Sequence, residues 1–193
     1  MIYRLLTYFL VLIFLFGCAN KEIYPITKIN LSTFTGLSIN ANRVLVENNY
    51  NNKIEYPFID HLIEYNIKYY LDEWIASRII SNYESENTIK ISIEKANVKA
   101  FSLDNNNIED IFKNKAAARI EIDVFVIIEI VDANDNNLAY LDLKVFKSKE
   151  LSENISLNEK DYFIQKMINE TIIDFDKLAI GKIKEVFLNY IKV

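Results

Sequence analysis

The sequence predicts a single α+β domain with the order β-α-β-β-β-α, in which two helices pack on one face of an antiparallel four-stranded sheet. Two patterns lead to this prediction. Several segments alternate apolar and polar residues with a period of two, which is typical of half-buried strands. Two other segments repeat apolar residues at spacings of three and four, as amphipathic helices do. Strands and helices that each have one apolar face can share a core when both helices cover the same side of the sheet.

Residues 116–131 give the clearest strand signal, because every second residue from Ala116 to Ile130 is apolar. The segment 132–137 is rich in Asp and Asn, which favour turns. Residues 138–148 then alternate again. Together the three segments predict a β-hairpin, and the core-facing residues of its second strand are Ala139, Leu141, Leu143 and Val145.

Residues 88–101 predict a third strand with one irregularity. Apolar residues keep one phase as far as Ile93 and take the opposite phase from Ala96 onward. An extra residue would restore the facing, so we expect a β-bulge near Glu94 and Lys95. The polar residues 102–115 that follow predict a loop. Upstream, residues 37–48 predict the first strand of the domain.

The last helix is predicted from a capping box, in which Ser156 is followed three residues later by Glu159. Its apolar stripe continues to about Ile191. Gly181 is a position at which this helix could kink.

The other helix is expected from Ile67 to Ile79, with Asn66 as its N-cap. Residues 57–65 leave two alternatives open. They extend this helix, with Pro57 in its first turn, or they form a separate loop.

The N-terminus has the features of an export signal. Arg4 precedes an apolar run from Leu5 to Phe16, and Gly17 follows. A positive start, about 7–15 apolar residues and a small residue at the cleavage site describe a secretory signal peptide. The run is shorter than the roughly 20 residues that a membrane-spanning helix needs.

The segment Leu15-Phe16-Gly17-Cys18 resembles the bacterial lipobox, and it holds the only cysteine of the chain. This resemblance implies acyl chains such as palmitate on Cys18, which anchor the protein to a membrane. In the enterobacterial sorting pattern, Ala19 in place of Asp implies the outer membrane. The alternative is an ordinary signal peptide with a chance cysteine. The expected organisation is a signal peptide at 1–17, a lipidated N-terminus and tether at 18–36, and a single domain at 37–193.

Several short motifs lie within residues 37–191: Pro57, Asp60-His61-Leu62, Trp74, Arg78-Ile79, Ala96-Asn97-Val98 and Ser156-Leu157-Asn158-Glu159. Together they resemble a family of uncharacterised proteobacterial lipoproteins. The family pattern has Pro, then Glu-His-Leu, then Trp followed four residues later by Arg-Leu. An Ala-Ser-Val strand and the start of the last helix also match. Asp60 stands where the family has Glu, and the prolines after His61 are absent, so the shape of 57–67 stays open.

The element order is more distantly similar to lipoproteins that accompany envelope lipid transporters. These include the lipopolysaccharide-assembly type and the auxiliary subunits of ABC-type lipid importers. The similarity implies a protein that binds partners and does not catalyse a reaction, by analogy of fold alone.

The composition excludes several classes of function. The chain has 27 acidic and 22 basic residues, without a basic patch, so we expect no nucleic-acid binding. No cysteine other than Cys18 is available for a disulfide or a metal site. Three glycines in the whole chain leave little material for phosphate-binding loops. We therefore expect no enzyme and no cofactor.

Two polar groupings are candidate sites of chemistry. His61, the only histidine, has Asp60 and Glu64 nearby and could hold a weakly bound metal; the alternative is a structural or surface histidine. Paired carboxylates on one strand face could do acid–base work, although such a row is more often the solvated face of a sheet. This row consists of Glu121, Asp123 and Glu129, with Arg119 beside them.

Two residue pairs are candidate partner contacts. Phe125 and Ile127 share a strand face, and an exposed apolar patch results if Tyr140 and Phe146 of the next strand are their neighbours. The alternative is burial under the loop 102–115. Trp74 and Arg78 lie one helical turn apart, so the arginine either packs on the indole or contacts a partner.

These observations lead to two hypotheses. The first is a lipid-anchored envelope lipoprotein that serves as a non-enzymatic accessory or assembly subunit of a membrane complex, facing the periplasm. The second is a periplasmic carrier that holds a lipid or another apolar small molecule between helices and sheet, as the 12 Tyr and 12 Phe suggest.

Overall fold

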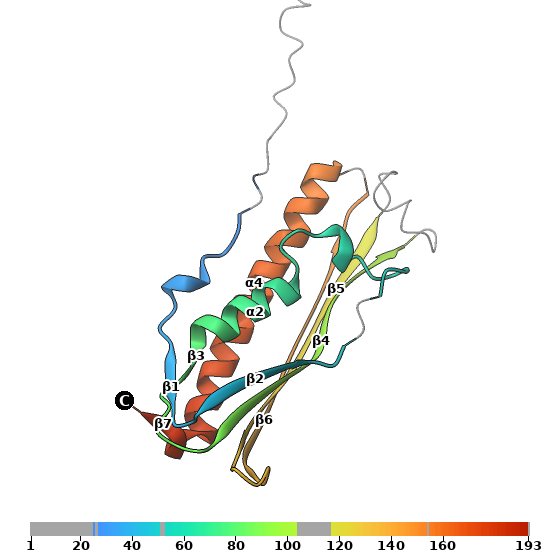
Figure 1. Ribbon diagram of the computed structural model, residues 1–193. Coiled ribbons are helices and arrows are strands. Elements are labelled where there is room, and N and C mark those ends of the chain that lie inside the picture. The colour runs from blue at the N-terminus through green and yellow to red at the C-terminus, as the bar shows by residue number, and fades with distance from the viewer. Residues whose placement is uncertain (1–24, 26, 51–52, 104–116, 154, 193) are drawn as a thin grey trace, which may run out of the picture.

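The computed structural model describes residues 25, 27–50, 53–103, 117–153 and 155–192. It has the expected α+β class, with two long helices beside a curved sheet (Figure 1). Cys18 and the signal peptide lie outside the described residues, as does most of the loop at 102–115.

The main sheet has four strands in the order β2-β4-β5-β6, which are β2 (Arg43–Asn48), β4 (Thr88–Ser102), β5 (Ala118–Val131) and β6 (Asn137–Leu151). Strand β5 is antiparallel to both of its neighbours, β4 and β6, as predicted. Strand β2 is parallel to β4, so the expectation of a purely antiparallel sheet is wrong. The chain passes through a helix between β2 and β4, and such a crossover returns the second strand in the same direction as the first.

The predicted first strand at 37–48 is also wrong, because it consists of two strands in different sheets. Strand β1 (Leu37–Ile39) ends at Ile39, and β2 begins at Arg43 after three intervening residues. The backbone N–H of Asn40 donates to Tyr190, whereas that of Asn42 donates to Asn87. At this break the chain therefore passes from one sheet to the other.

Strand β1 is the centre of a small second sheet. It pairs in parallel with β3 (Ile79–Ser81) and antiparallel with β7 (Ile191–Lys192). Neither flanking strand is expected from the sequence. Both are short extensions of predicted helices, and they bring the two ends of the domain together.

Helix α2 (Ile67–Arg78) and helix α4 (Leu157–Val186) confirm the two predicted helices and their caps. Asn66 accepts a hydrogen bond from Tyr69 N–H, and the Ser156–Glu159 capping box is complete. Helix α4 runs through Gly181 and ends at Val186, before the expected Ile191, where the 3₁₀ turn η3 (Leu188–Tyr190) leads into β7. Its 30 residues span about 45 Å.

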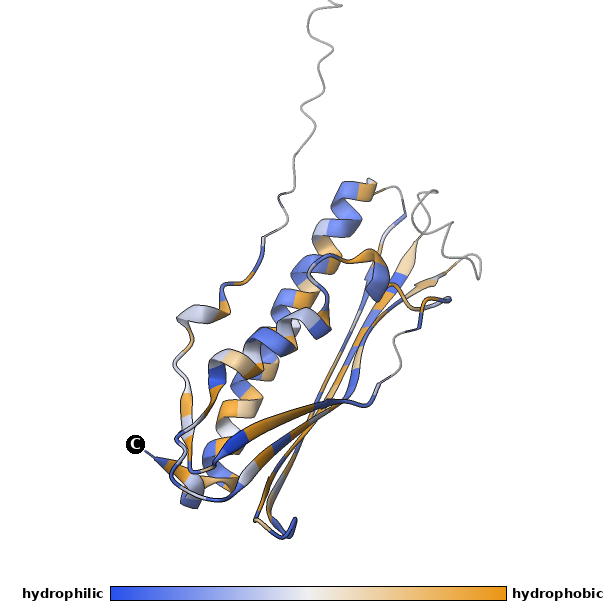
Figure 2. Cartoon of the chain, in the orientation of Figure 1, coloured by the Kyte–Doolittle hydropathy of each residue, from blue (hydrophilic) through white to orange (hydrophobic). Residues whose placement is uncertain are grey.

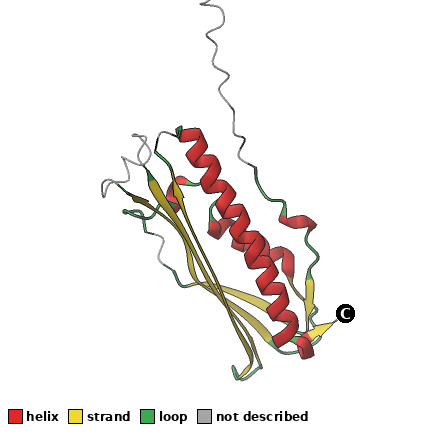
Figure 3. Ribbon diagram, turned by 180° about the vertical axis from the view of Figure 1, so that it is seen from behind, coloured by secondary structure: helices red, strands yellow, loops and turns green. Residues whose placement is uncertain are grey.

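Both helices lie on the same face of the main sheet (Figure 3). Lys147 of β6 reaches from that face to Asp174 of α4, with a Nζ–Oδ2 distance of 2.8 Å. The rings of Trp74 on α2 and Phe175 on α4 meet edge to face with centroids 5.0 Å apart. Apolar and polar residues alternate along the strands (Figure 2), and every second residue of β5 from Ala118 to Ile130 is buried.

The hairpin and the bulge are confirmed. Strands β5 and β6 pair along their whole length across the Asp- and Asn-rich turn. The β4–β5 register shifts between Ile93 and Lys95, where the bulge is expected. Because of this shift Ile93 and Ala96 are both buried.

Residues 57–65 do not extend helix α2. The backbone at Phe58 bridges to Lys99 of β4, and a separate 3₁₀ turn, η2 (Asp60–Leu62), follows. Asp60 is buried, and its Oδ1 accepts a hydrogen bond from Val98 N–H at 2.8 Å. This bond ties the segment to the sheet edge and keeps it apart from the helix axis.

Candidate functional site

The residues described on the N-terminal side of strand β1 pack against both helices. We call residues 27–36 the N-terminal strap. Its 3₁₀ turn η1 (Leu31–Thr33) buries Leu31, which is 1% exposed. The carbonyl of Thr27 accepts a hydrogen bond from Asn169 of α4 at 2.6 Å. The sequence places these residues in the tether at 18–36, whereas the structure shows them as part of the packed domain.

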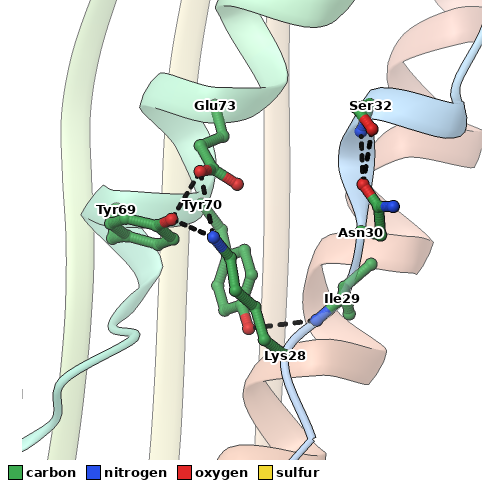
Figure 4. A network of polar contacts seen from close by, with 7 residues as sticks. All are labelled: Lys28, Ile29, Asn30, Ser32, Tyr69, Tyr70 and Glu73. Atoms are coloured by element: carbon green, nitrogen blue, oxygen red, sulfur yellow. Dashed lines mark hydrogen bonds and ion pairs between the residues drawn. The ribbon is translucent and has the colours of Figure 1, made fainter.

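A polar network fixes the strap to helix α2 (Figure 4). Lys28 donates to the Tyr69 hydroxyl and forms an ion pair with Glu73 at 3.2 Å. Tyr69 in turn donates to Glu73. The Tyr70 hydroxyl accepts a hydrogen bond from Ile29 N–H at 3.3 Å. The residues of this network lie more than 40 positions apart, and sequence periodicity relates only residues that are close along the chain. The network therefore cannot be predicted from the sequence.

The charges of this network reinforce one another. The hydrogen bonds from Lys28 to Tyr69 and to Glu73 raise the pKa of the lysine above its ordinary value. The hydrogen bond from Tyr69, and then that from Lys28, lowers the pKa of Glu73. Both groups are therefore charged at neutral pH, and Lys28 also lies 4.6 Å above the Tyr69 ring.

Trp74 and Arg78, the predicted contact pair, meet at Asp176 of α4. Trp74 Nε1 donates to Asp176 Oδ1 at 2.8 Å. The Arg78 guanidinium donates to both carboxylate oxygens at 2.7 Å, and it also donates to the Thr35 carbonyl of the strap. The arginine stacks on Phe34, 4.4 Å from the ring centre, and not on the indole. Trp74 is fully buried, so any partner contact here would have to use Arg78.

Phe125 and Ile127 lie half-buried on the outer face of the sheet. In the register of the hairpin, Tyr140 and Phe146 are their diagonal neighbours on β6, and both are exposed. Asp142 and Lys144 lie between these two aromatic residues and pair at 2.9 Å. Charged groups thus interrupt the apolar patch. A partner contact at Phe125 and Ile127 stays a prediction.

His61 and the carboxylate row of strand β5 lie in separate surroundings. His61 is exposed, while its neighbour Asp60 faces the sheet. Arg119 pairs with Glu121 at 3.0 Å, and Lys95 pairs with Asp123 at 3.0 Å. Among the described residues, no group of three or more His, Cys, Asp or Glu side chains is arranged to hold a metal ion.

Two open grooves flank helix α2. The strap groove, of about 410 Å³, lies beside the N-terminal strap and is lined by residues of both segments, including Leu31 and Ala76. The edge groove, of about 390 Å³, lies between α2 and β2. Its lining is mainly apolar and consists of Val44, Val46, Asn48, Asp72, Ile75, Ala76 and Ile79.

The edge groove arises because strand β2 extends beyond the cover of the helices. Val46 faces the same side of the sheet as buried Ile91, its partner on β4. Val46 is nevertheless 43% exposed.

No helix within the described part of the chain is long and apolar enough to cross a membrane.

No protein-family model matches this sequence, and neither does any curated protein sequence. Among solved structures, a minor lipoprotein from Acinetobacter baumannii is similar with a TM-score of 0.33 and 13% identity, over 78% of this chain and 93% of that one. A DUF330 protein from Xanthomonas campestris has a TM-score of 0.28 and 7% identity, over 83% of this chain and 94% of that one. At these TM-scores neither similarity carries an argument about function.

Proposed function

We propose that this chain is a lipid-anchored lipoprotein of the bacterial cell envelope and that it serves as a non-enzymatic accessory subunit of a membrane complex. The proposal rests on the short length of chain between Cys18, the cysteine of the lipobox-like segment, and the packed N-terminal strap. From Cys18 to Thr27 the chain can span at most about 30 Å. A lipid on Cys18 would therefore keep the domain near the membrane surface, facing the periplasm. The residue after the cysteine, Ala19, favours the outer membrane.

The edge groove and the free side of β2 are the surface that supports a binding role. Strand β2 ends the main sheet, and the unpaired backbone of an edge strand can receive a strand from another protein. The side chains of Val46 and Leu45 are exposed beside this edge. A partner strand added to β2 would cover them and would close the groove against α2.

The anchor is tested by Cys18→Ser. We expect the variant to fold normally and to leave the membrane fraction, and we expect mass spectrometry to find acyl chains on the wild-type N-terminus only. Full membrane retention of the variant would contradict the lipid anchor.

The binding role is tested by photo-crosslinking in cells, with the crosslinker at Val46 and, as a matched control, at Tyr140 on the far edge strand. We expect a discrete crosslinked envelope protein from Val46 that Tyr140 does not give. Identical product patterns from both positions would contradict docking at β2.

The edge groove also favours a second candidate, a carrier for a lipid or another apolar small molecule. Its volume of about 390 Å³ lies within the usual range for small-molecule sites, roughly 300–1,000 Å³. Native mass spectrometry of the mature protein tests this role. A bound lipid in the wild type that disappears in Val46→Asp would support it, and a ligand-free wild type would contradict it.

A further inference from the structure

Four exposed leucine and isoleucine side chains surround one end of the domain. Ile54 is 76% exposed, Leu62 55%, Leu157 50% and Leu103 46%. We call the surface formed by these four residues the anchor end. Side chains of this size are normally at least partly covered in soluble domains, although single exposed ones are common. The opposite end also exposes Tyr83 and Leu188, so what distinguishes this end is that the N-terminal strap leads toward it.

The topology brings the four residues together. Ser102 at the end of β4 pairs with Ala118 at the start of β5, and Ala118 pairs with Leu151 at the end of β6. Leu103 therefore lies at the same end as the start of α4, where Leu157 is found. Leu62 lines a pocket with Asp161 and Ile164 of α4. The segment that follows Ile54 bridges to β4 at Phe58 and Lys99, in the half of the strand nearer this end.

The N-terminal strap runs toward the anchor end. It leads from β1, beside the end of the chain, up to Thr27, which is bonded to Asn169 of α4 (Figure 1). From Asn169 to Leu157 the helix rises only about 18 Å. The nine residues from Cys18 to Thr27 can span about 30 Å, so the acylated cysteine can reach the plane of the anchor end.

Cationic side chains lie over aromatic rings beside the exposed apolar residues. The Nζ atoms of Lys53 and Lys99 lie 5.2 and 5.4 Å from the centre of the Phe58 ring. Arg119 lies 5.2 Å from the centre of the Phe101 ring. An aromatic body with a long cationic side chain beside it is the combination found at membrane interfaces, where the apolar part meets acyl chains and the charge meets phosphate.

We propose that the anchor end lies against the phospholipid surface that holds the lipidated Cys18. Ile54, Leu62 and Leu103 enter the headgroup region, and Lys53 and Lys99 face lipid phosphates. This inference rests on the lipid anchor of the proposed function. It adds an orientation, because the β5–β6 turn and the C-terminus then point away from the membrane. Strand β2 pairs with the half of β4 farther from the anchor end, so its free edge also lies away from the membrane and is open to a partner.

The test uses the mature acylated protein in vesicles of phosphatidylethanolamine and phosphatidylglycerol. Acylation of Cys18 leaves an introduced cysteine as the only free thiol, so a nitrobenzoxadiazole dye can be placed at Leu62→Cys or Ile54→Cys. The control is Leu188→Cys, since Leu188 is 69% exposed at the opposite end of α4. We expect nitroxide-labelled lipids to quench the dye at Leu62 and Ile54 several-fold more than at Leu188. Circular dichroism verifies that each labelled variant is folded.

The other outcomes separate the two proposals. Equal or stronger quenching at Leu188, with the protein retained on vesicles, overturns the orientation and leaves the lipid anchor intact. Protection of Leu62 from a water-soluble quencher without quenching by lipid shows that protein and not lipid covers the anchor end, which also overturns the orientation. Loss of the acylated protein from the vesicles overturns the anchor and the orientation together.

Discussion

Asp176 is the residue on which the junction of the two helices depends. Its carboxylate neutralises Arg78 and accepts the Trp74 indole N–H, and the ionic side chains of Arg78 and Asp176 are only 12% and 13% exposed. Removal of one partner from a buried ion pair leaves the other charge without compensation. We therefore predict that Asp176→Ala lowers the free energy of unfolding by about 3 kcal/mol.

The matched control for this prediction is Asp174→Ala. Asp174 lies on the same helix and pairs with Lys147, but its side chain is 49% exposed, so its loss should cost less than about 1 kcal/mol. Chemical denaturation followed by the fluorescence of Trp74, the only tryptophan, measures both. Equal losses in the two variants would show that the buried pair contributes no special stability.

The carboxyl group of Asp60 makes stability depend on pH. Burial raises its pKa from the ordinary 3.8 to about 6. The folded state therefore binds this proton more tightly than the unfolded state does, and the stability contribution of the group is lost as pH rises through about 6. We predict that the free energy of unfolding is larger at pH 5 than at pH 8 by about 1 kcal/mol from this group.

Asp60→Asn isolates this contribution. The amide oxygen can still accept the hydrogen bond from Val98 N–H, while the buried charge is gone. We expect the variant to gain stability at pH 8 and to show a flatter dependence on pH, as measured by denaturant titrations at both pH values. A variant with the same pH dependence as the wild type would rule out Asp60 as the source.

At the scale of single residues, the sequence predicts contacts only between residues that are close along the chain. Trp74 and Arg78 could be identified as a pair because they lie one helical turn apart. Their shared partner Asp176 is about 100 residues away, and no periodicity connects the two helices. Cys18 is the opposite case, because its role depends on adjacent residues alone and can be predicted without the fold.

Among the elements, strand β4 offers the sharpest test, because its bulge has a defined position. Ile93 pairs with Val126 and Lys95 pairs with Phe125, so Glu94 has no place in the ladder. Deletion of Glu94 should leave a regular strand, with every apolar residue still facing the core. We predict that this deletion variant folds cooperatively, with a small loss of stability.

Deletion of Lys90 from the same strand is the control. Lys90 pairs with Glu129 within the regular ladder, so its loss shifts one side of the strand by one residue and turns core side chains toward solvent. We expect no cooperative thermal transition in this variant by circular dichroism. Equal stability of the two deletion variants would contradict the assigned register.

The long strands and helices could be predicted because each carries a repeating pattern with its own caps or turn. Strands β1, β3 and β7 have two or three residues each, too few for a period to emerge. The parallel pairing of β2 was missed for a different reason. A strand's alternation reports which side is buried and contains no information about the direction of its neighbour.

At the scale of the whole molecule, the N-terminal strap joins the proposed anchor to the core. It contributes Leu31 to the interior, and its Thr35 carbonyl accepts a hydrogen bond from Arg78. The sequence predicts a tether here because the segment has no alternation and follows a cleavage site. Its buried contacts all involve residues far along the chain, so only the fold reveals them.

Two truncations of the mature chain separate a tether from a structural strap. A chain that starts at Pro25 keeps all contacts described for the strap, and we expect its free energy of unfolding to equal that of the delipidated full-length body. A chain that starts at Leu37 loses the burial of Leu31, a side chain whose removal from a core costs about 3 kcal/mol, and it also leaves Arg78 without the Thr35 carbonyl. We therefore predict a loss of at least that size in denaturant titrations. If both truncated chains were equally stable, the strap would be a tether and not a structural element. It would then not fix the position of Cys18 relative to the domain, and the proposed orientation at the membrane would lose this support.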